Sequence, residues 1–215
     1  MDNLMTRQLN SILSEQEVDF ERNYELEIKD NFLDNKGWLW LKEIYEEMGG
    51  KEDLPLLKKL TFDFKIKRNI ILYDDELSFN RYRLSTFRSE MYSEMTFDFC
   101  EAQKRLCRSF EKECLKVGMQ ERIWTGAPVA KFRFGEASEP GDFSGNGSSG
   151  WKLQAYNNVQ IDIQSRLHGY KLIRLSPFET LMTGGSLKRL DQLLINPKEE
   201  QRQIIFNWLM RKIES

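Results

Sequence analysis

One stretch, residues 61–83, constrains the fold of this chain most, because it places acidic side chains within two neighbouring apolar runs. Asp63 interrupts the first run. The second run ends in three consecutive acids, Asp74, Asp75 and Glu76. A buried carboxylate is costly unless it is paired, hydrogen-bonded or bound to a metal. Carboxylates that converge at the ends of neighbouring strands therefore indicate, first of all, a site for a divalent cation.

The two apolar runs, residues 60–66 and 70–73, are separated by three polar residues, a spacing that predicts a β-hairpin. Because side chains alternate along a strand, acids two positions apart share a face. We therefore expect Asp74 and Glu76 on one face with Asp63, and the acid between them on the other. A purely structural interpretation is also open, in which the three consecutive acids begin a polar turn and Asp63 pairs with Lys65 or Arg68 across the hairpin.

The composition bounds the class of protein. The chain has 215 residues, 40% hydrophobic and 31% charged, which suits one domain with insertions better than two ordinary domains. The apolar runs are too short to cross a membrane, and no basic segment leads into an apolar stretch, so we expect a cytoplasmic protein without a membrane partner. A formal net charge of -2 disfavours a protein that coats DNA, although a local basic face stays open.

Cysteine and histidine usage disfavours much familiar chemistry. Cys100, Cys107 and Cys114 recur every seven residues, which places them on one face of a helix as core residues, too far apart for disulfides. Their spacing also lacks the close pairs of zinc sites. His168 is the only histidine and is predicted in a turn, so mechanisms that depend on a catalytic histidine are disfavoured.

Hydrophobic periodicity predicts alternating helices and strands along the rest of the chain. The expected helices are residues 1–30 (one or two helices), 38–48, 84–117, 151–167, 186–195 and 197–213. The expected strands are residues 60–66, 70–73 and 170–175. This order predicts an α/β protein with a long helical insertion.

The only low-complexity segment, residues 135–150, is rich in glycine and serine and predicts a loop. Its end approaches the phosphate-binding pattern G-x-x-x-x-G-K-[ST]. However, Trp151 displaces the lysine to Lys152, and Leu153 replaces the residue whose hydroxyl would bind a metal. A nucleotide hydrolase is therefore disfavoured, while backbone N–H groups at a helix start would still suit a phosphate of nucleic acid.

The acids also carry a resemblance. With Asp63 in the pattern FDF, Asp74 eleven residues later and Glu76 two further on, the chain resembles the restriction-endonuclease-like PD-(D/E)XK nucleases, especially the group similar to the very-short-patch repair endonuclease. In that group a helix and a strand follow the acids, and QSRLHGYKLIRLS, residues 164–176, is similar to this element. The resemblance covers residues 38–82 and 151–178.

The resemblance implies a restriction-endonuclease-like α/β fold, a mixed sheet flanked by helices with a helical insertion and a helical C-terminal tail. The expected N-terminal helical segment, core and tail are residues 1–35, 36–178 (with the insertion at about 84–118) and 179–215.

The resemblance also implies a function, that of a metal-dependent nuclease that hydrolyses phosphodiester bonds in DNA. Asp63, Asp74 and Glu76 would hold Mg²⁺ or Mn²⁺, which acidifies water and neutralises charge on the phosphate. The lysine that usually follows the second acid by two residues is replaced here by Glu76. We therefore expect Lys152 to assist the water or the phosphate, and the loop at residues 141–150 to line the substrate channel.

Other interpretations stay open. Glu43 or Glu47, from the first core helix, could supply a further ligand. Aromatic and basic residues interleave in residues 79–88, where contacts with bases or phosphates compete with an ordinary amphipathic helix. The alternative function is a non-catalytic nucleic-acid-binding or protein-interaction subunit built on a decayed nuclease scaffold, as one part of a larger assembly.

Overall fold

The structure is a computed structural model that describes residues 3–214. The chain divides into two compact units, each discontinuous in sequence. Unit 1 comprises the chain up to Leu26, Thr61–Asp75 and the chain from Gly169 onwards. Unit 2 comprises Glu27–Leu60 and Glu76–His168.

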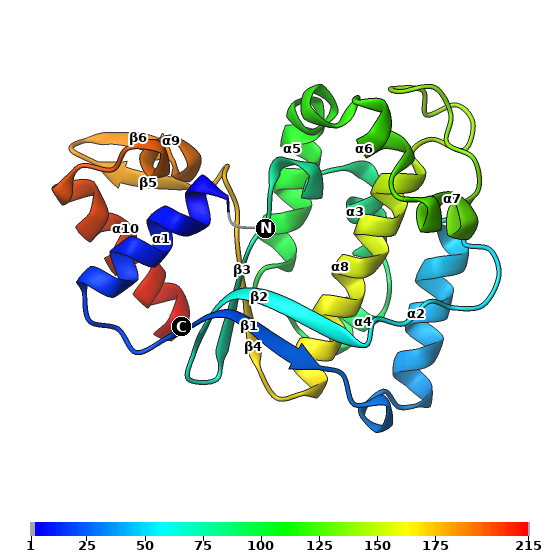
Figure 1. Cartoon of the computed structure of the whole chain (residues 1–215), viewed down its shortest axis with the longest axis horizontal. Helices are drawn as coiled ribbons and strands as arrows, with labels where there is room; N and C mark the ends of the chain where they lie inside the picture. The colour runs from blue at the N-terminus through cyan, green and yellow to red at the C-terminus, as the bar shows by residue number, and fades with distance from the viewer. Residues whose placement is uncertain (1–2, 215) are drawn as a thin grey trace. The chain divides into compact units, whose positions relative to one another are not determined.

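Unit 1 is built on a mixed four-stranded sheet in the order β1-β2-β3-β4. The strands are β1 (Glu21–Glu27), β2 (Lys59–Ile66), β3 (Asn69–Tyr73) and β4 (Lys171–Leu175). β2 and β3 are antiparallel and form the predicted hairpin, with Phe64 opposite Ile71. β4 runs parallel to β3, with Ile173 opposite Ile71 (Figure 1). Parallel neighbours need a long connection, and the chain between Tyr73 and Lys171 supplies it.

Helices from the two ends of the chain complete the core of unit 1. They are α1 (Leu4–Glu15), α9 (Leu190–Ile195) and α10 (Glu199–Glu214). α1 and α10 contact each other, and Arg202 of α10 forms an ion pair with Glu15 and donates to Ser11 Oγ at 2.7 Å. The buried core contains Leu9, Ile12, Leu13, Phe64, Ile66, Ile71, Ile173, Leu175, Leu193, Leu194, Ile205 and Leu209. The core of unit 1 therefore needs apolar residues from both the N-terminal helix and the C-terminal helices.

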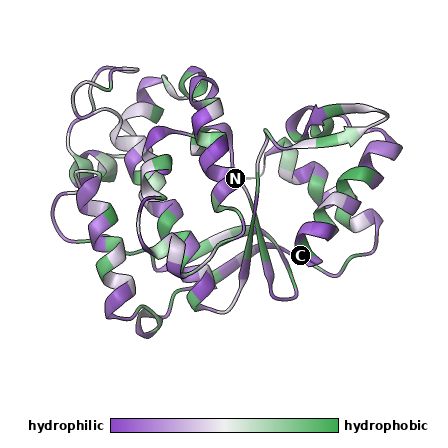
Figure 2. Ribbon diagram, turned by 180° about the vertical axis from the view of Figure 1, so that it is seen from behind, coloured by the Kyte–Doolittle hydropathy of each residue, from purple (hydrophilic) through white to green (hydrophobic). Residues whose placement is uncertain are grey.

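Unit 2 is helical, and α8 (Ser149–Leu167) lies at its centre. The other helices are η1 (Asp30–Phe32), α2 (Asn35–Glu47), η2 (Glu76–Ser78), α3 (Arg81–Thr86), α4 (Met91–Glu94), α5 (Cys100–Gly118), α6 (Glu121–Thr125) and α7 (Pro128–Phe134). α2, α3, α6 and α7 all pack against α8. Hydrophilic and hydrophobic residues alternate around these helices (Figure 2), and α8 buries polar side chains such as Asn158 and Asp162 as well as apolar ones.

The long helix predicted at residues 84–117 is three helices, α3, α4 and α5. Asn80 caps the first of them, because its side chain accepts hydrogen bonds from the N–H groups of Tyr82 and Arg83. The backbone of α5 is kinked at Phe110, where φ is -117° and ψ is 15°. No glycine or proline marks these breaks in the sequence, so hydrophobic periodicity alone predicted one continuous helix.

Two other helical predictions were wrong in part. Residues 1–30 contain α1, as expected, but also strand β1, whose side chains are mostly exposed and so show no apolar alternation. Residues 186–195 contain strand β6 (Ser186–Arg189) before α9, paired with β5 (Thr180–Thr183). Gly184 and Gly185, both with positive φ, turn the chain between these strands, a glycine pair typical of tight hairpins.

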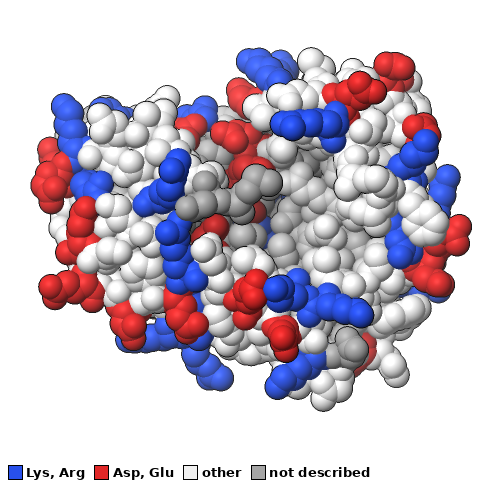
Figure 3. All heavy atoms as spheres, in the orientation of Figure 1, with Lys and Arg blue, Asp and Glu red and all other residues white. Residues whose placement is uncertain are grey.

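The elements together make an α/β protein with flanking helices and a C-terminal helix, as expected, and its mixed sheet has four strands where three were predicted. Among residues 3–214, no helix combines the length and the apolar character that crossing a membrane requires. On the face shown in Figure 3, lysine and arginine side chains are interspersed with aspartate and glutamate.

Candidate anion-binding site

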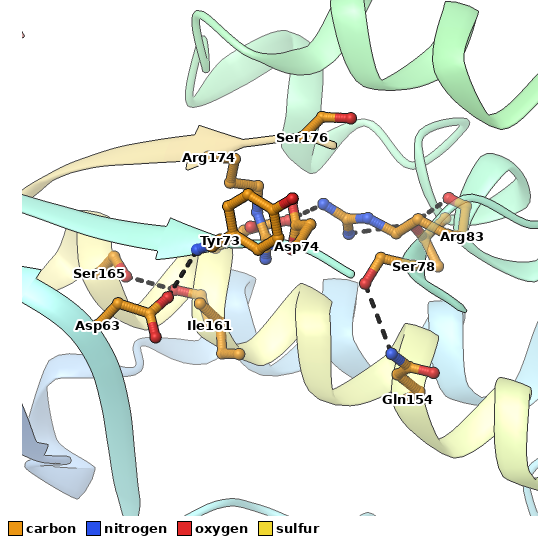
Figure 4. Close-up of polar contacts among 12 residues, drawn as sticks. Asp63, Tyr73, Asp74, Ser78, Arg83, Gln154, Ile161, Ser165, Arg174 and Ser176 are labelled. Atoms are coloured by element: carbon orange, nitrogen blue, oxygen red, sulfur yellow. Dashed lines mark hydrogen bonds and ion pairs between the residues drawn. The ribbon is translucent and has the colours of Figure 1, made fainter. Parts of the chain in front are cut away.

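The four residues predicted to form the site divide between the two units. Asp63 and Asp74 belong to unit 1, and Glu76 and Lys152 belong to unit 2. Asp63 lies in β2 on the half-buried face, and its Oδ2 atom accepts a hydrogen bond from the backbone N–H of Tyr73 at 2.7 Å (Figure 4). This carboxylate therefore makes a structural contact with the backbone of the neighbouring strand, across the predicted hairpin.

Asp74 lies directly after β3 and is 3% exposed. Its Oδ1 atom accepts a hydrogen bond from Nη1 of Arg174, on β4, at 2.5 Å, and the two side chains form an ion pair shielded from water. The backbone N–H of Asp74 donates to the carbonyl oxygen of Leu175 at 2.8 Å. Removing one partner of such a pair leaves an uncompensated buried charge. Asp74 therefore joins the ends of two parallel strands.

The prediction that strand alternation carries Glu76 onto the face of Asp74 was wrong. β3 ends at Tyr73, and Glu76 begins the short 3₁₀ helix η2, so alternation no longer applies to it. Among residues 3–214, no three or more histidine, cysteine, aspartate or glutamate side chains are grouped so that they could hold a metal ion. Since Asp74 is already neutralised by Arg174, these side chains as they lie do not fit the predicted Mg²⁺ or Mn²⁺ site.

His168 caps the C-terminal end of α8 and has a structural role. Its Nδ1 atom lies 2.9 Å from the carbonyl oxygen of Gln164, and its Nε2 atom accepts a hydrogen bond from the N–H of Lys29 at 3.1 Å. The proton must therefore reside on Nδ1, which donates to the carbonyl. Both ring nitrogens are occupied by backbone groups, which agrees with the prediction that histidine-dependent chemistry is disfavoured.

Lys152 is the predicted residue whose surroundings suit a ligand. It lies in the second turn of α8 and is 7% exposed. Its Nζ atom donates to Oδ1 of Asn146 at 2.8 Å and lies 5.6 Å from the centre of the Tyr82 ring. In the described chain no carboxylate lies within ion-pair distance of this amine. A buried ammonium group with only a neutral partner is electrostatically unsatisfied.

The pKa of Lys152 reflects the same environment. Burial lowers the pKa of the amine below its ordinary value, and the positive charge of the nearby Lys51 lowers it further. Both effects disfavour the charged form. A bound anion would act in the opposite direction, by supplying the negative charge that the protein itself does not place beside Nζ.

Lys152 opens into a pocket of about 230 Å³ within unit 2. The pocket is lined by Glu47, Met48, Arg81, Tyr82, Ser85, Phe143, Gly145, Asn146 and Lys152. Arg81 stacks over the Phe143 ring at 3.5 Å and forms two hydrogen bonds with the carboxylate of Glu111, at 2.8 and 3.2 Å. The wall thus combines ammonium, guanidinium, hydroxyl and amide groups with two aromatic rings.

The glycine-rich loop builds one side of this pocket and is held by its own polar groups. Nδ2 of Asn146 donates to the carbonyl oxygens of Phe134 and Glu136, at 2.8 and 2.7 Å, so that Oδ1 is directed to Lys152. Gly147 has a φ of +69°, and a Cβ atom there would lie 1.9 Å from the Tyr82 hydroxyl oxygen. Only glycine allows both this conformation and this close approach.

Tyr82 offers the pocket a hydrogen-bond donor. Its hydroxyl oxygen accepts from the backbone N–H of Ser148 at 3.2 Å. Burial raises the pKa of this hydroxyl, although the bond from Ser148 acts in the opposite direction, so the group stays protonated near neutral pH. Its own O–H has no acceptor among the described residues. A ligand oxygen could therefore accept from it.

The two serine side chains at the start of α8 form hydrogen bonds within the protein. The Ser148 side chain accepts from the N–H of Trp151 at 3.0 Å and donates to the carbonyl oxygen of Trp124 at 2.6 Å. Ser149 Oγ donates to the carbonyl oxygen of Gly135 at 2.6 Å. These contacts cap the N–H group of Trp151, and phosphate binding by the N–H groups of this helix start stays a prediction.

The sequence identified part of this pocket. Lys152 and the loop were singled out, Glu47 was proposed as a metal ligand, and Tyr82 lies in the aromatic and basic stretch at residues 79–88. Asn146 and Lys51 were not identified. Asn146 lies within the GNGSSGWK pattern, where only the glycines and the lysine drew attention, and Lys51 has no pattern around it.

The fold and the pocket define a mixed α/β protein with a buried, unpaired lysine at a polar pocket. The chain belongs to a family of unknown function, DUF7255, whose model matches residues 43–196. This match contains strands β2 and β3, the acids Asp63 and Asp74, and all residues that line the Lys152 pocket. No curated protein and no solved structure matches the chain.

Proposed function

We propose that this protein binds nucleic acid and that the Lys152 pocket receives one of its phosphate groups. One observation carries the proposal: the Lys152 amine is buried, has no carboxylate partner and opens into a polar pocket. Phosphate oxygens would accept hydrogen bonds from Lys152 and Tyr82 and would supply the missing negative charge. Lysine is a common ligand for phosphate in this way.

The pocket wall also favours nucleic acid among phosphate compounds. Phe143 and Tyr82 present aromatic rings beside the cationic groups, and bases stack on such rings. The charges in Figure 3 are mixed, and the net charge is -2. Binding should therefore depend on a few local phosphate contacts, with a shallow dependence on salt concentration.

Direct binding measurements test this proposal. Fluorescence anisotropy with labelled single-stranded and double-stranded oligonucleotides would compare the unchanged protein with Lys152→Gln and Lys112→Gln. Lys112 is an exposed lysine of α5, so its replacement removes the same charge outside the pocket. Loss of a charge-assisted contact should weaken binding about 10- to 100-fold in Lys152→Gln, and Lys112→Gln should bind almost as well as the original. Equal effects of the two substitutions would contradict the assignment of the pocket.

A metal-dependent nuclease is the second candidate. It is favoured by the order of elements that the resemblance implies: acids on or just after adjacent strands β2 and β3, then helix α8, then strand β4. In this function Asp74 would have to exchange Arg174 for a cation. Incubation of supercoiled plasmid with Mg²⁺ or Mn²⁺, with and without chelator, tests it. Nicking that requires metal and disappears in a folded Asp74→Asn protein would support it, and its absence would count against it.

A further inference from the structure

We infer that the Lys152 pocket selects a terminal phosphate, a phosphate monoester at a strand end or on a nucleotide, over the internal phosphodiesters of a strand. This inference rests on the proposed function and names the substrate class for the same pocket. It follows from the depth of the amine, the size of the pocket and the charge of its surroundings.

The depth of Lys152 carries the first step. The side chain is only 7% exposed, so a ligand oxygen reaches Nζ only by entering the pocket. An internal phosphodiester has a sugar on each side and lies along a continuous backbone, so its oxygens reach a recessed amine less easily. A terminal phosphate has one ester bond and three free oxygens, so it can enter with the rest of the strand outside.

The size of the pocket agrees with this. Sites for whole small molecules and cofactors usually have volumes of about 300–1,000 Å³. At about 230 Å³ the pocket lies below that range. It suits a phosphate with part of its sugar better than a complete nucleotide. Tyr82 and Phe143, which line the same pocket, would then face the sugar or the first base.

The charges give the third step. A phosphate monoester carries a charge of about -1.5 to -2 near neutral pH, whereas an internal phosphodiester carries a single negative charge. Lys152 lines the pocket, and the positive charge of Lys51, which lies outside the lining, acts on it from nearby. Glu47 also lines the pocket, but it is exposed and forms no ion pair with Lys152, so solvent screens its charge. A dianion matches these two cations better than a monoanion.

Free nucleoside monophosphates carry the same group as strand ends, so the experiment includes both sources. Short single-stranded oligonucleotides of one sequence would be prepared with a 5′-phosphate, with a 3′-phosphate or with hydroxyl groups at both ends. Their dissociation constants would be measured for the unchanged protein, for Lys152→Gln, for Lys51→Gln and for the control Lys112→Gln. Nucleoside monophosphates and inorganic phosphate would serve as competitors, and thermal melting would confirm that each variant is folded.

We expect one of the two phosphorylated oligonucleotides to bind about tenfold tighter than the hydroxyl form. This preference should disappear in Lys152→Gln, decrease in Lys51→Gln and persist in Lys112→Gln. Equal binding of all three oligonucleotides, weakened in Lys152→Gln, would overturn the inference but leave the proposed function standing. Binding of nucleoside monophosphates without any oligonucleotide would support the monoester and overturn nucleic acid as its source. No binding of either would overturn both.

Discussion

Arg83 and Lys152 are two basic residues buried in unit 2, and their partners differ. Lys152 is part of helix α8, and Arg83 contacts that helix through Asp162. Arg83 donates to the carboxylate of Asp162 on α8 at 2.7 Å and to the hydroxyl oxygen of Tyr92 at 2.9 Å. Lys152 has only the amide oxygen of Asn146. The first cation is neutralised by a carboxylate of the protein, whereas the second has only a neutral partner. The ion pair of Arg83 is structural, and the proposed function assigns the unpaired amine of Lys152 to a ligand.

Unit 1 also contains a buried arginine that is neutralised by a carboxylate. Arg174 and Asp74 form a buried ion pair of their own, with side chains 0% and 2% exposed. Arginine suits this task because its planar guanidinium group is always charged and donates in a fixed geometry. Lysine loses its charge more readily when buried, so an unpaired buried lysine is the less stable arrangement. Stability measurements can therefore separate the two kinds of site.

The largest effect is expected at Asp162. Asp162→Ala leaves the Arg83 guanidinium buried beside a cavity, and should lower the free energy of unfolding by about 3–5 kcal/mol. Urea denaturation would measure this. The matched control is Glu111→Ala, which removes the partner of the partly exposed Arg81 and should cost at most about 1 kcal/mol. Similar losses of stability in the two variants would show that the buried ion pair of Arg83 contributes no more than the partly exposed ion pair of Arg81.

Asp74→Asn should have the next largest effect. The amide keeps the shape of the side chain but loses the charge that Arg174 faces, so we expect a loss of about 1.5–3 kcal/mol. This loss should be the same with and without Mg²⁺. If Mg²⁺ stabilises the unchanged protein but not the variant, Asp74 binds the cation. Asp74 would then be a ligand-binding residue and not a structural one.

Gly147→Ala tests whether the loop shapes the pocket. The added Cβ atom would collide with the Tyr82 hydroxyl at a backbone conformation that alanine rarely adopts. We expect a loss of about 1–3 kcal/mol in stability, together with weaker oligonucleotide binding, because Tyr82 and Asn146 would shift. Gly184→Ala is a suitable control, since it has a positive φ but nothing within 4 Å of the added atom. It should lose stability without losing binding.

Lys152→Met should have the smallest effect on stability and a large effect on binding. The variant removes a desolvated charge and keeps the apolar stem, so its stability should lie within about 1 kcal/mol of the original, on the stable side. Because the pKa of Lys152 is lower in the folded state, the unfolded chain binds more protons. The stability of the unchanged protein should therefore rise, relative to the variant, from the lowered pKa up to about pH 10.4. Urea titrations at several pH values would measure this, and a large loss of stability in Lys152→Met would make its role structural.

The sequence predicted the parts of the fold that have strong local patterns. The hairpin of β2 and β3, strand β4 and helices α8 and α10 are all present, because apolar periodicity and turn residues define them locally. Strand β1 was missed because its exposed polar residues have no such pattern. The helix breaks at residues 87–99 depend on packing rather than on glycine or proline.

The candidate site was predictable only in part. Lys152 was expected to assist the water or the phosphate, and the structure shows that it is buried at a polar pocket. Nothing local to Asp74 indicates that Arg174, a hundred positions away, neutralises it, because that contact exists only after β3 and β4 pair. The resemblance to the nucleases predicted Asp74 as a metal ligand. In the structure Asp74 instead forms a buried ion pair with Arg174.

The pairing of α1 with α10 has a consequence for how the chain is made. Ribosomes make the N-terminal part of a chain first, yet Leu9, Ile12 and Leu13 share a core with Ile205 and Leu209, which are translated long after α1. All segments of unit 2 have been made by His168. The segments of unit 2 are thus all available for folding before α9 and α10, the two helices that pack against α1, have been made.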